Sequence, residues 1–457
     1  MKKNQYLAVV ITFGMIAVVA TSFMASTKAQ AIPVFARKYR TACTTCHIGF
    51  PKLTPFGEAF RRNGYQVPAV DEAFVKEEPV ALGADAWKEV WPRGVWPGAI
   101  PGLPPMSLRV ENALSIVREV EHQEENVRAD FVFPEELALL TGGTLGEDIS
   151  FYGDIDLFDE NEPGHIGRLF IQFDNLLDNW FPEYLFNLRV GQFEPGVLAF
   201  SNHRRLTLTP YLFNMFTIAD NNFRFEPAQQ GFELNGTLWG RLGYAAGVVN
   251  GTGIGEGEFF DDNSEKDGYG RIELKLFGTR LDGEQDEGPE VLAQAENWRD
   301  DSIRIGAFIY AGESNITPHV EVEDHHEEEE EAEAIEPEPF TDQFERVGGD
   351  VRLQVWNLDL FGAVLYGNND DPDAERRRDR VNYVSWFGEV DWVVFPWMVA
   401  AFRWEEVDPD SGLADTKRAV GSLITYPRAN IRMVFEGRFG VHSDNADKYI
   451  AALDYVF

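Results

Sequence analysis

The sequence is poor in cysteine, in basic residues and in long apolar runs, and each shortage excludes a class of protein. Two cysteines among 457 residues exclude a disulfide framework. Lys and Arg number 40 against 76 Asp and Glu, giving a formal net charge of −36. Such acidity argues against a nucleic-acid partner, because a negative surface repels phosphates. A hydrophobic content of 44% excludes a disordered chain.

Residues 1–31 are interpreted as a secretory signal peptide. They combine a basic start at Lys2 and Lys3, an apolar run over 7–20 and a small-x-small cleavage site that ends at Ala31. The alternative is a membrane-anchor helix, although the apolar run is short for a span. Beyond residue 31 no run of 18 apolar residues occurs. We therefore expect the mature chain to be either soluble in an exported compartment or a membrane β-barrel.

From residue 107 onward apolar and polar residues alternate, which predicts β-strands. Val351, Leu353 and Val355, for example, alternate with Arg352 and Gln354. An even number of strands of about ten residues is typical of outer-membrane barrels. The alternative is a soluble β-sandwich or propeller. We predict about 16 antiparallel strands, at 107–119, 131–141, 148–159, 166–175, 185–193, 229–238, 241–250, 268–278, 302–311, 346–356, 359–367, 382–392, 397–406, 417–426, 430–439 and 449–457.

The connections between these strands support a barrel, because long and short connections alternate as they do in outer-membrane barrels. One connection breaks the pattern: the 279–301 segment is long and acidic but falls among the short turns, which suggests a miscounted strand. The last strand ends at the aromatic Phe457, as in bacterial outer-membrane barrels. Residues 69–106 are rich in Trp and Pro and are interpreted as a linker or plug.

The alternation also predicts which charged residues face the barrel interior. We expect these charges to pair with one another and with water, as barrel walls commonly do. The alternative is that some of the arginines hold an interior guest that carries carboxylates. The predicted inward set is Arg109, Glu111, Asp154, Asp156, Asp174, Arg189, Arg304, Arg352, Glu389, Asp391, Arg403, Glu405, Arg432, Glu436 and Arg438.

Both cysteines lie in one motif, Cys43-Thr-Thr-Cys46-His47, which has the C-x-x-C-H spacing of a c-type haem attachment site. Two thiols on one helical turn match the two haem vinyl groups, and the adjacent histidine ligates the iron. A thioredoxin-like site would need a βαβ context, and a zinc site would need further Cys or His ligands nearby. No histidine lies between 48 and 121. We therefore predict one covalently bound haem c.

The residues after this motif predict a short capped helix. Thr54 and Pro55 are suited to the N-cap and first helical position, and Gly64 to the C-terminal end. We expect Phe56, Phe60 and Tyr65 to pack on the haem. The alternative is that they make only the ordinary packing contacts of a helix.

The C-x-x-C-H motif, the pattern P-x-L-T-P-x-G-x-x-F-[K/R]-x-x-G-Y and the barrel together resemble the fused outer-membrane monohaem cytochrome c–porins of iron-oxidising bacteria. The resemblance implies one haem in or at the mouth of a roughly 16-stranded barrel, and electron transfer from extracellular Fe(II) to a periplasmic carrier. Glu58, where a basic residue is expected, and the long 69–106 segment depart from the pattern. The matching residues are Cys43, Cys46, His47, Pro51, Leu53, Thr54, Pro55, Gly57, Phe60, Arg61, Gly64 and Tyr65.

The sixth haem ligand is not settled by the sequence. Met106 is a candidate, since Met/His ligation raises the haem potential and would suit an oxidant of Fe(II); otherwise it is a packing residue. An open sixth position is a further alternative. The remaining candidates, which fall mostly in predicted external loops, are His122, His165, His203 and His442.

Residues 319–345 form a predicted external loop that holds 13 of the 76 acidic residues. His325 and His326 lie among these carboxylates and are candidates for capturing an external divalent metal. The alternative is a solvated loop with no ligand.

These features predict a mainly β protein of the bacterial outer membrane. We expect a signal peptide over 1–31, a haem-binding helical domain over 32–68 in the periplasm or the barrel lumen, the 69–106 linker or plug, and a porin-like barrel over 107–457. The favoured function is electron transfer between an extracellular donor, Fe(II) first, and a periplasmic carrier such as a soluble cytochrome, with Fe(II)-oxidising activity left open. The alternatives are an outward electron conduit and a diffusion porin with a haem-bearing plug.

Overall fold

The computed structural model describes residues 34–68, 71–82, 99–102, 104–121, 124–146, 148–159, 162–251, 265–284, 296, 298–317, 339–375, 380–410, 413–440 and 447–457. The signal-peptide prediction lies outside this part of the chain. No helix within it is long and apolar enough to cross a membrane.

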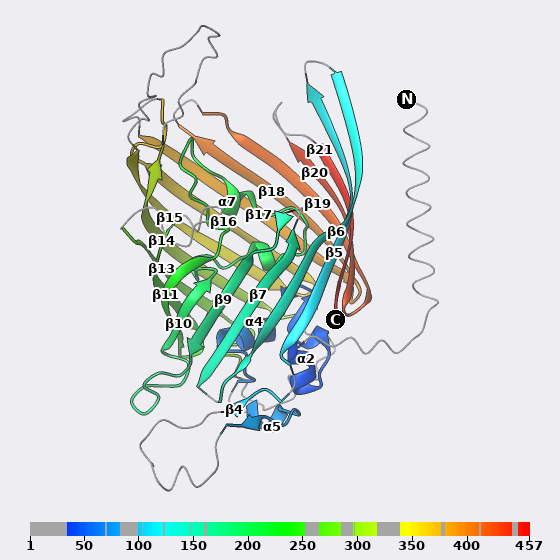
Figure 1. The fold of residues 1–457 in the computed structure, drawn as a ribbon, viewed down its shortest axis with the longest axis vertical. Helices are drawn as coiled ribbons and strands as arrows, with labels where there is room; N and C mark the ends of the chain where they lie inside the picture. Colours follow the sequence, from blue (N-terminus) through cyan, green and yellow to red (C-terminus); the bar gives the residue numbers. More distant parts are fainter. Residues whose placement is uncertain are drawn as a thin grey trace, which may run out of the picture.

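All of the predicted strands form, and they close into one 16-stranded antiparallel barrel (Figure 1). A two-residue strand, β8 (Glu162–Pro163), adds to the outer end of β7. The sixteen barrel strands are β5 (Met106–Glu121), β6 (Glu124–Thr144), β7 (Ile149–Asp159), β9 (Ile166–Phe173), β10 (Asn187–Phe193), β11 (Gln229–Leu238), β12 (Leu242–Val249), β13 (Asp267–Leu276), β14 (Ser302–Ile316), β15 (Phe340–Val355), β16 (Leu358–Asn369), β17 (Val381–Phe395), β18 (Met398–Pro409), β19 (Thr416–Arg428), β20 (Ile431–Gly440) and β21 (Asp447–Val456).

The barrel closes where the last strand pairs with the first. β21 runs antiparallel to β5, with Asp454 opposite Glu111. Beyond the strand, Phe457 N donates to Leu108 O at 2.9 Å. Closure leaves no open sheet edge, which is the condition for crossing a bilayer with strands.

The strands alternate between a lumen face and an apolar outer face. Along β14, Ile305 and Ile309 are about half exposed, whereas the residue before each, Arg304 and Phe308, is buried. Trp239 and Trp356 lie at the β11–β12 and β15–β16 turns and are 78% and 72% exposed. An apolar band bordered by aromatic residues is the exterior of an outer-membrane barrel, and the aromatics mark the level of the lipid headgroups.

The two ends of the barrel differ in the connections they carry. One end, here called the turn end, has tight turns such as 239–241 and 356–357, and the opposite loop end has the longer connections. The connection between β13 and β14 is long and lies at the turn end without adding a strand, so the suggestion of a miscounted strand is wrong. Its Asp282 carbonyl accepts a hydrogen bond of 2.6 Å from Asn63 Nδ2, so the first part of this connection contacts the N-terminal domain.

Residues 194–228, between β10 and β11, leave the loop end and fold back into the lumen; we call them the inward loop. The loop contains a short 3₁₀ helix, η1 (Asn202–Arg204), and α7 (Leu212–Met215), which packs against β17 and β18 (Figure 1). The predicted external position of this connection is therefore wrong, because wall side chains bind its backbone. Glu436 accepts from the N–H groups of Leu208 and Thr209, and Glu405 accepts from Leu212 N.

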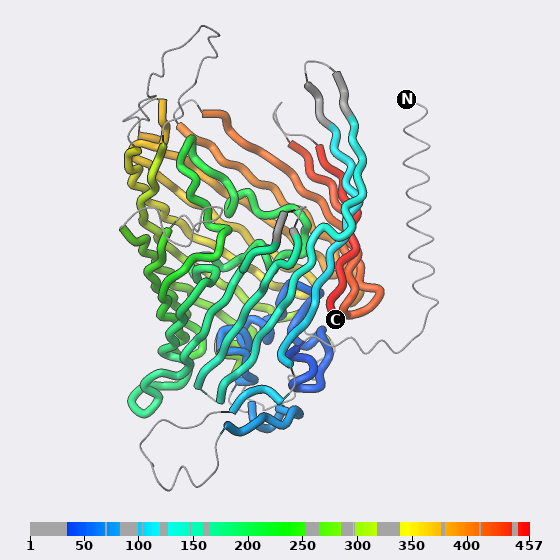
Figure 2. Tube along the Cα trace, in the orientation of Figure 1, coloured from blue at the N-terminus to red at the C-terminus, as the bar shows by residue number. Residues whose placement is uncertain are grey.

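Residues 34–68 form a small helical domain at the turn end of the barrel, here called the plug (Figures 1 and 2). Its elements are α2 (Val34–Tyr39), α3 (Cys43–Cys46), the hairpin β1 (His47–Gly49) and β2 (Lys52–Leu53), and α4 (Pro55–Arg62). The following segment adds α5 (Asp71–Phe74) and the small pair β3 (Val80–Ala81) and β4 (Ala99–Ile100). The 319–345 prediction needs one correction, since residues 340–345 belong to strand β15.

A charge placed on the outer face at mid-strand should destabilise the barrel in lipid. Ile309→Arg is expected to lower the free energy of unfolding in lipid vesicles by about 2–4 kcal/mol, because the bilayer must accept a guanidinium near its centre. Urea titration of the vesicle-inserted protein measures this, with Ile309→Leu as the matched control. Equal stability of the two variants would show that this face is not in lipid.

Candidate cofactor cavity in the barrel lumen

The Cys43 and Cys46 side chains lie on the single turn of α3 and face the same cavity. Both thiols are free of a disulfide bond. The chain becomes extended at His47, which terminates the helix, and this places the imidazole beside the two thiols on the cavity wall. The predicted grouping of two thiols and one imidazole is thus present in three dimensions.

The His47 ring is held in one orientation. Its Nδ1 lies 3.2 Å from the Pro51 carbonyl oxygen, and because a carbonyl can only accept, Nδ1 carries the proton. Burial lowers the pKa of His47 to about 4, so the imidazole is neutral at physiological pH. A neutral ring with Nδ1–H bound in this way has its lone pair on Nε2, which is the arrangement of a metal-ligating histidine.

Helix α4 is seated directly against the cysteine turn. Thr54 is its N-cap, with Oγ1 accepting from Gly57 N at 3.0 Å, and Pro55 takes the first helical position. A Cβ at position 57 would overlap the Cys46 carbonyl oxygen, so only glycine allows this approach. Gly64 follows the helix with a φ of +65°, as its predicted role at the helix end requires.

Ion pairs fasten the plug to the barrel wall. Lys52 pairs with Asp359 at 2.8 Å and with Asp391. Two further plug side chains, Glu58 and Arg62, also reach the wall. Arg62 pairs with Glu273 of β13.

Glu58, which departs from the family pattern, has a wall partner on each of two strands. Its carboxylate accepts from Arg304 of β14 at 2.9 Å and from Arg352 of β15. Although burial raises its pKa, these guanidinium groups hold the pKa of Glu58 well below its usual range. The acidic residue is explained by the basic wall that it meets.

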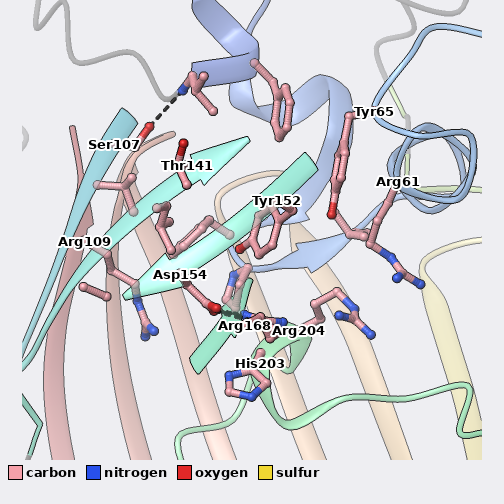
Figure 3. A pocket seen from close by; sticks show the side chains of 18 of the residues that line it. Arg61, Tyr65, Ser107, Arg109, Thr141, Tyr152, Asp154, Arg168, His203 and Arg204 are labelled. Carbon is pink, nitrogen blue, oxygen red and sulfur yellow. Dashed lines mark hydrogen bonds and ion pairs between the residues drawn. The ribbon is translucent and has the colours of Figure 1, made fainter. Parts of the chain in front are cut away.

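The plug, the wall and the inward loop line an open cavity of about 1370 Å³. This exceeds the roughly 300–1,000 Å³ of common ligand pockets. The aromatic residues predicted to pack at the haem, Phe56, Phe60 and Tyr65, line it together with the wall residues Tyr152 and Phe170. Figure 3 shows two of them, Tyr65 and Tyr152. A flat, largely apolar guest attached to Cys43 and Cys46 fits such a lining.

Most of the inward charges that the sequence predicted form ion pairs, some with one another and others with charged side chains outside the predicted set. Arg403 pairs with Glu389 at 3.1 Å, and Arg352 pairs with Asp359 at 2.7 Å. Arg403 also donates to the Thr209 carbonyl oxygen at 2.6 Å, so the pairs help to hold the inward loop.

The structure places the candidate sixth ligands differently from the sequence ranking. Met106 begins β5 with 46% exposure, and the neighbouring Ser107 lines the cavity instead. His203, ranked low because its loop was predicted to be external, comes from η1 to the cavity wall (Figure 3). Within the described part of the chain no other side chain holds the His203 ring by a hydrogen bond or ion pair. His165 also lines the cavity but lies 3.5 Å from Asp156 and is 60% exposed.

The remaining candidates lie outside the described residues: His122, His442, His325 and His326. No cluster of three or more His, Cys, Asp or Glu side chains suited to a free metal ion occurs in the described residues. The length of the 194–228 connection was the one sequence signal that could have pointed to an inward loop.

No known family and no curated protein matches the chain by sequence. Solved barrels resemble it in fold. They include the loop L8 deletion mutant of OmpT from Vibrio cholerae (TM-score 0.45, 9% identity, 77% of this chain and 98% of that chain) and OmpF of Salmonella typhi in complex with daunomycin (TM-score 0.48, 8% identity, 77% and 97%). Outer-membrane expressed OmpT of Vibrio cholerae has a TM-score of 0.45, 8% identity and coverage of 82% and 100%. This chain is similar to them in its barrel.

Loss of the Glu58 carboxylate should loosen the plug while leaving the barrel closed. Glu58→Gln leaves two wall guanidinium groups without this partner, which we expect to weaken plug docking by about 3 kcal/mol. Proteolysis within the plug should then accelerate about 100-fold. The matched control is Glu72→Gln on α5, where the carboxylate is exposed. Equal cleavage of the variant and the control would contradict the anchoring role.

Proposed function

We propose that the protein passes electrons across the outer membrane between an extracellular donor, Fe(II) first, and a periplasmic carrier through one covalently bound haem c. The observation that carries the proposal is the cavity inside the barrel that is lined by Cys43, Cys46 and His47. In outer-membrane barrels the short turns face the periplasm, which supports a periplasmic position for the plug.

The residues around the cavity are suited to that cofactor. Cys43 and Cys46 would bind it through thioethers, and His47 would ligate the iron through Nε2. His203 would be the sixth ligand in place of Met106, because its side chain is exposed to the cavity and its ring makes no hydrogen bond or ion pair within the described residues. Desolvation by the surrounding protein and the nearby Arg168 guanidinium lower the pKa of His203 to about 3, which keeps the imidazole neutral and its lone pair available. A haem in this place supplies a one-electron Fe(III)/Fe(II) couple.

The lumen beyond the cavity favours electron transfer over diffusion. There the inward loop packs aromatic rings against the wall in one buried cluster, which also includes the cavity-lining Phe193. Ring centroids of Phe223 and Phe344 are 4.5 Å apart, and those of Phe200 and Phe387 are 4.6 Å apart. Close-packed rings leave little room for a hydrated solute, whereas an electron needs no open path.

The cavity also reaches toward the outside. His165, in the connection between β7 and β9 at the loop end, lines the cavity and is largely exposed. A donor at this rim would be closer to the cofactor than one held at the top of the taller strands. The short β9, with 8 residues against 21 in β6, makes this approach possible.

Removing the two thiols should abolish haem attachment. The double variant Cys43→Ala, Cys46→Ala is expected to lose the c-type α-band and all denaturation-resistant haem, whereas Thr44→Ala should keep both, since it leaves both attachment thiols in place. Absence of an α-band in the unaltered protein would reject the haem and leave a porin.

Anaerobic addition of Fe(II) to the oxidised protein distinguishes the direction of electron transfer. Recordings in planar lipid bilayers measure the ion conductance of the barrel. Fast reduction and low ion conductance support the proposal. An unreduced haem would favour outward transfer to external acceptors, and porin-like conductance would favour a diffusion porin with a haem-bearing plug.

Variants of the two candidate sixth ligands are expected to give different haem spectra. His203→Ala should convert a low-spin ferric haem to high-spin by removing an axial nitrogen, and Met106→Leu should leave the spectrum unchanged. Low-temperature electron paramagnetic resonance records both spin states. A His203→Ala protein that stays low-spin would exclude this histidine.

A further inference from the structure

Arg61 of the plug is a half-buried cation that has no ion-pair partner within the described part of the chain. It lies on α4 and lines the cavity, yet within the described part of the chain its guanidinium makes no hydrogen bond and no ion pair, and its Nε is fully buried without a partner. A buried guanidinium left unpaired is strongly unfavourable. Its retention in a chain with a net charge of −36 points to an anion that the folded chain itself does not supply.

The other cationic groups of the cavity are already paired. Arg109 pairs with Glu136 at 2.8 Å, and Arg168 pairs with Asp154. On the wall, Arg189 pairs with Glu233 at 2.9 Å. The unbalanced charge is therefore confined to Arg61.

Arg204 brings a second guanidinium close to Arg61. It comes from η1 on the inward loop, and its Nη1 pairs with Glu194 at 2.9 Å (Figure 3). The Arg204 charge, followed by burial, lowers the pKa of Arg61 to about 9. The attraction of Glu194 offsets this lowering only in part, so an anion between the two guanidinium groups would interact favourably with both.

The position of Arg61 indicates which anion this is. Gly57 and Arg61 are four residues apart on α4 and share one helix face, so Arg61 lies one turn beyond the place where α4 touches Cys46. A guest fixed to Cys43 and Cys46 and lying along this face would bring its far edge toward Arg61. Haem carries two carboxylates, and they lie on the edge opposite its two vinyl groups.

We propose that Arg61 of the plug and Arg204 of the inward loop bind the haem propionates and so join the two elements across the cavity. This assignment rests on the proposed function. It explains why the cavity has a cationic end and why the inward loop reaches down to the plug.

The test compares charge removal at Arg61 with the same charge removal outside the cavity. Arg61→Gln should shift the haem midpoint potential to lower values, because a nearby positive charge disfavours the ferric form, and should shift the propionate bending mode in the resonance Raman spectrum. Arg61→Lys should restore most of the potential. Arg40→Gln removes an exposed charge of the plug that does not line the cavity and should change neither quantity.

The outcomes separate this assignment from the proposed function. A normal c-type spectrum with the potential and Raman mode unmoved in Arg61→Gln would overturn only the propionate assignment. Lack of haem in the unaltered protein would remove both. Should Arg61→Gln fail to accumulate as a folded protein, Arg204→Gln carries the same expectation for both readouts, and its failure to shift them would equally overturn the assignment.

Discussion

Closure of the barrel is the constraint on which the rest of this structure depends. Backbone groups in hydrocarbon need hydrogen-bond partners, so the strands must pair around a full circle, and the pairing of β21 with β5 completes it. A closed wall then separates an apolar exterior from an interior that tolerates charge. Within that interior, paired residues such as Arg403 and Glu389 can be buried, and they in turn hold the inward loop and the plug.

The plug and the inward loop approach each other from opposite ends of the barrel, and the cavity is the space they leave. Lys52, Glu58 and Arg62 fasten the plug to five wall strands through charges of both signs. Such a polar, directional attachment fixes position more than it adds stability, because each buried pair loses hydration. Fixed position matters here, since thiols and imidazole must present one geometry to a rigid guest.

Under the proposed function, aromatic packing inside the barrel would hinder the passage of solutes but not the transfer of electrons. The buried aromatic cluster that includes Phe193 joins side chains of the inward loop to side chains of the wall. The low wall at β9 meanwhile brings the cavity near the outer surface. In the proposed function, these features shorten the distance between an external donor and the haem. A single haem at the periplasmic face would be separated from that donor by a hydrocarbon layer of about 30 Å.

The sequence by itself determined the sixteen strands, their closure-compatible order, the C-x-x-C-H turn and the Thr54–Gly64 helix, because these depend on periodicity, spacing and capping between near neighbours. Only the tertiary structure decided that residues 194–228 fold inward, that Glu58 meets two wall arginines, and that His203 rather than Met106 reaches the cavity. Those outcomes depend on contacts between residues more than 100 positions apart. Local pattern holds no information about such contacts, since the direction of a loop is set by the charges of the wall it meets.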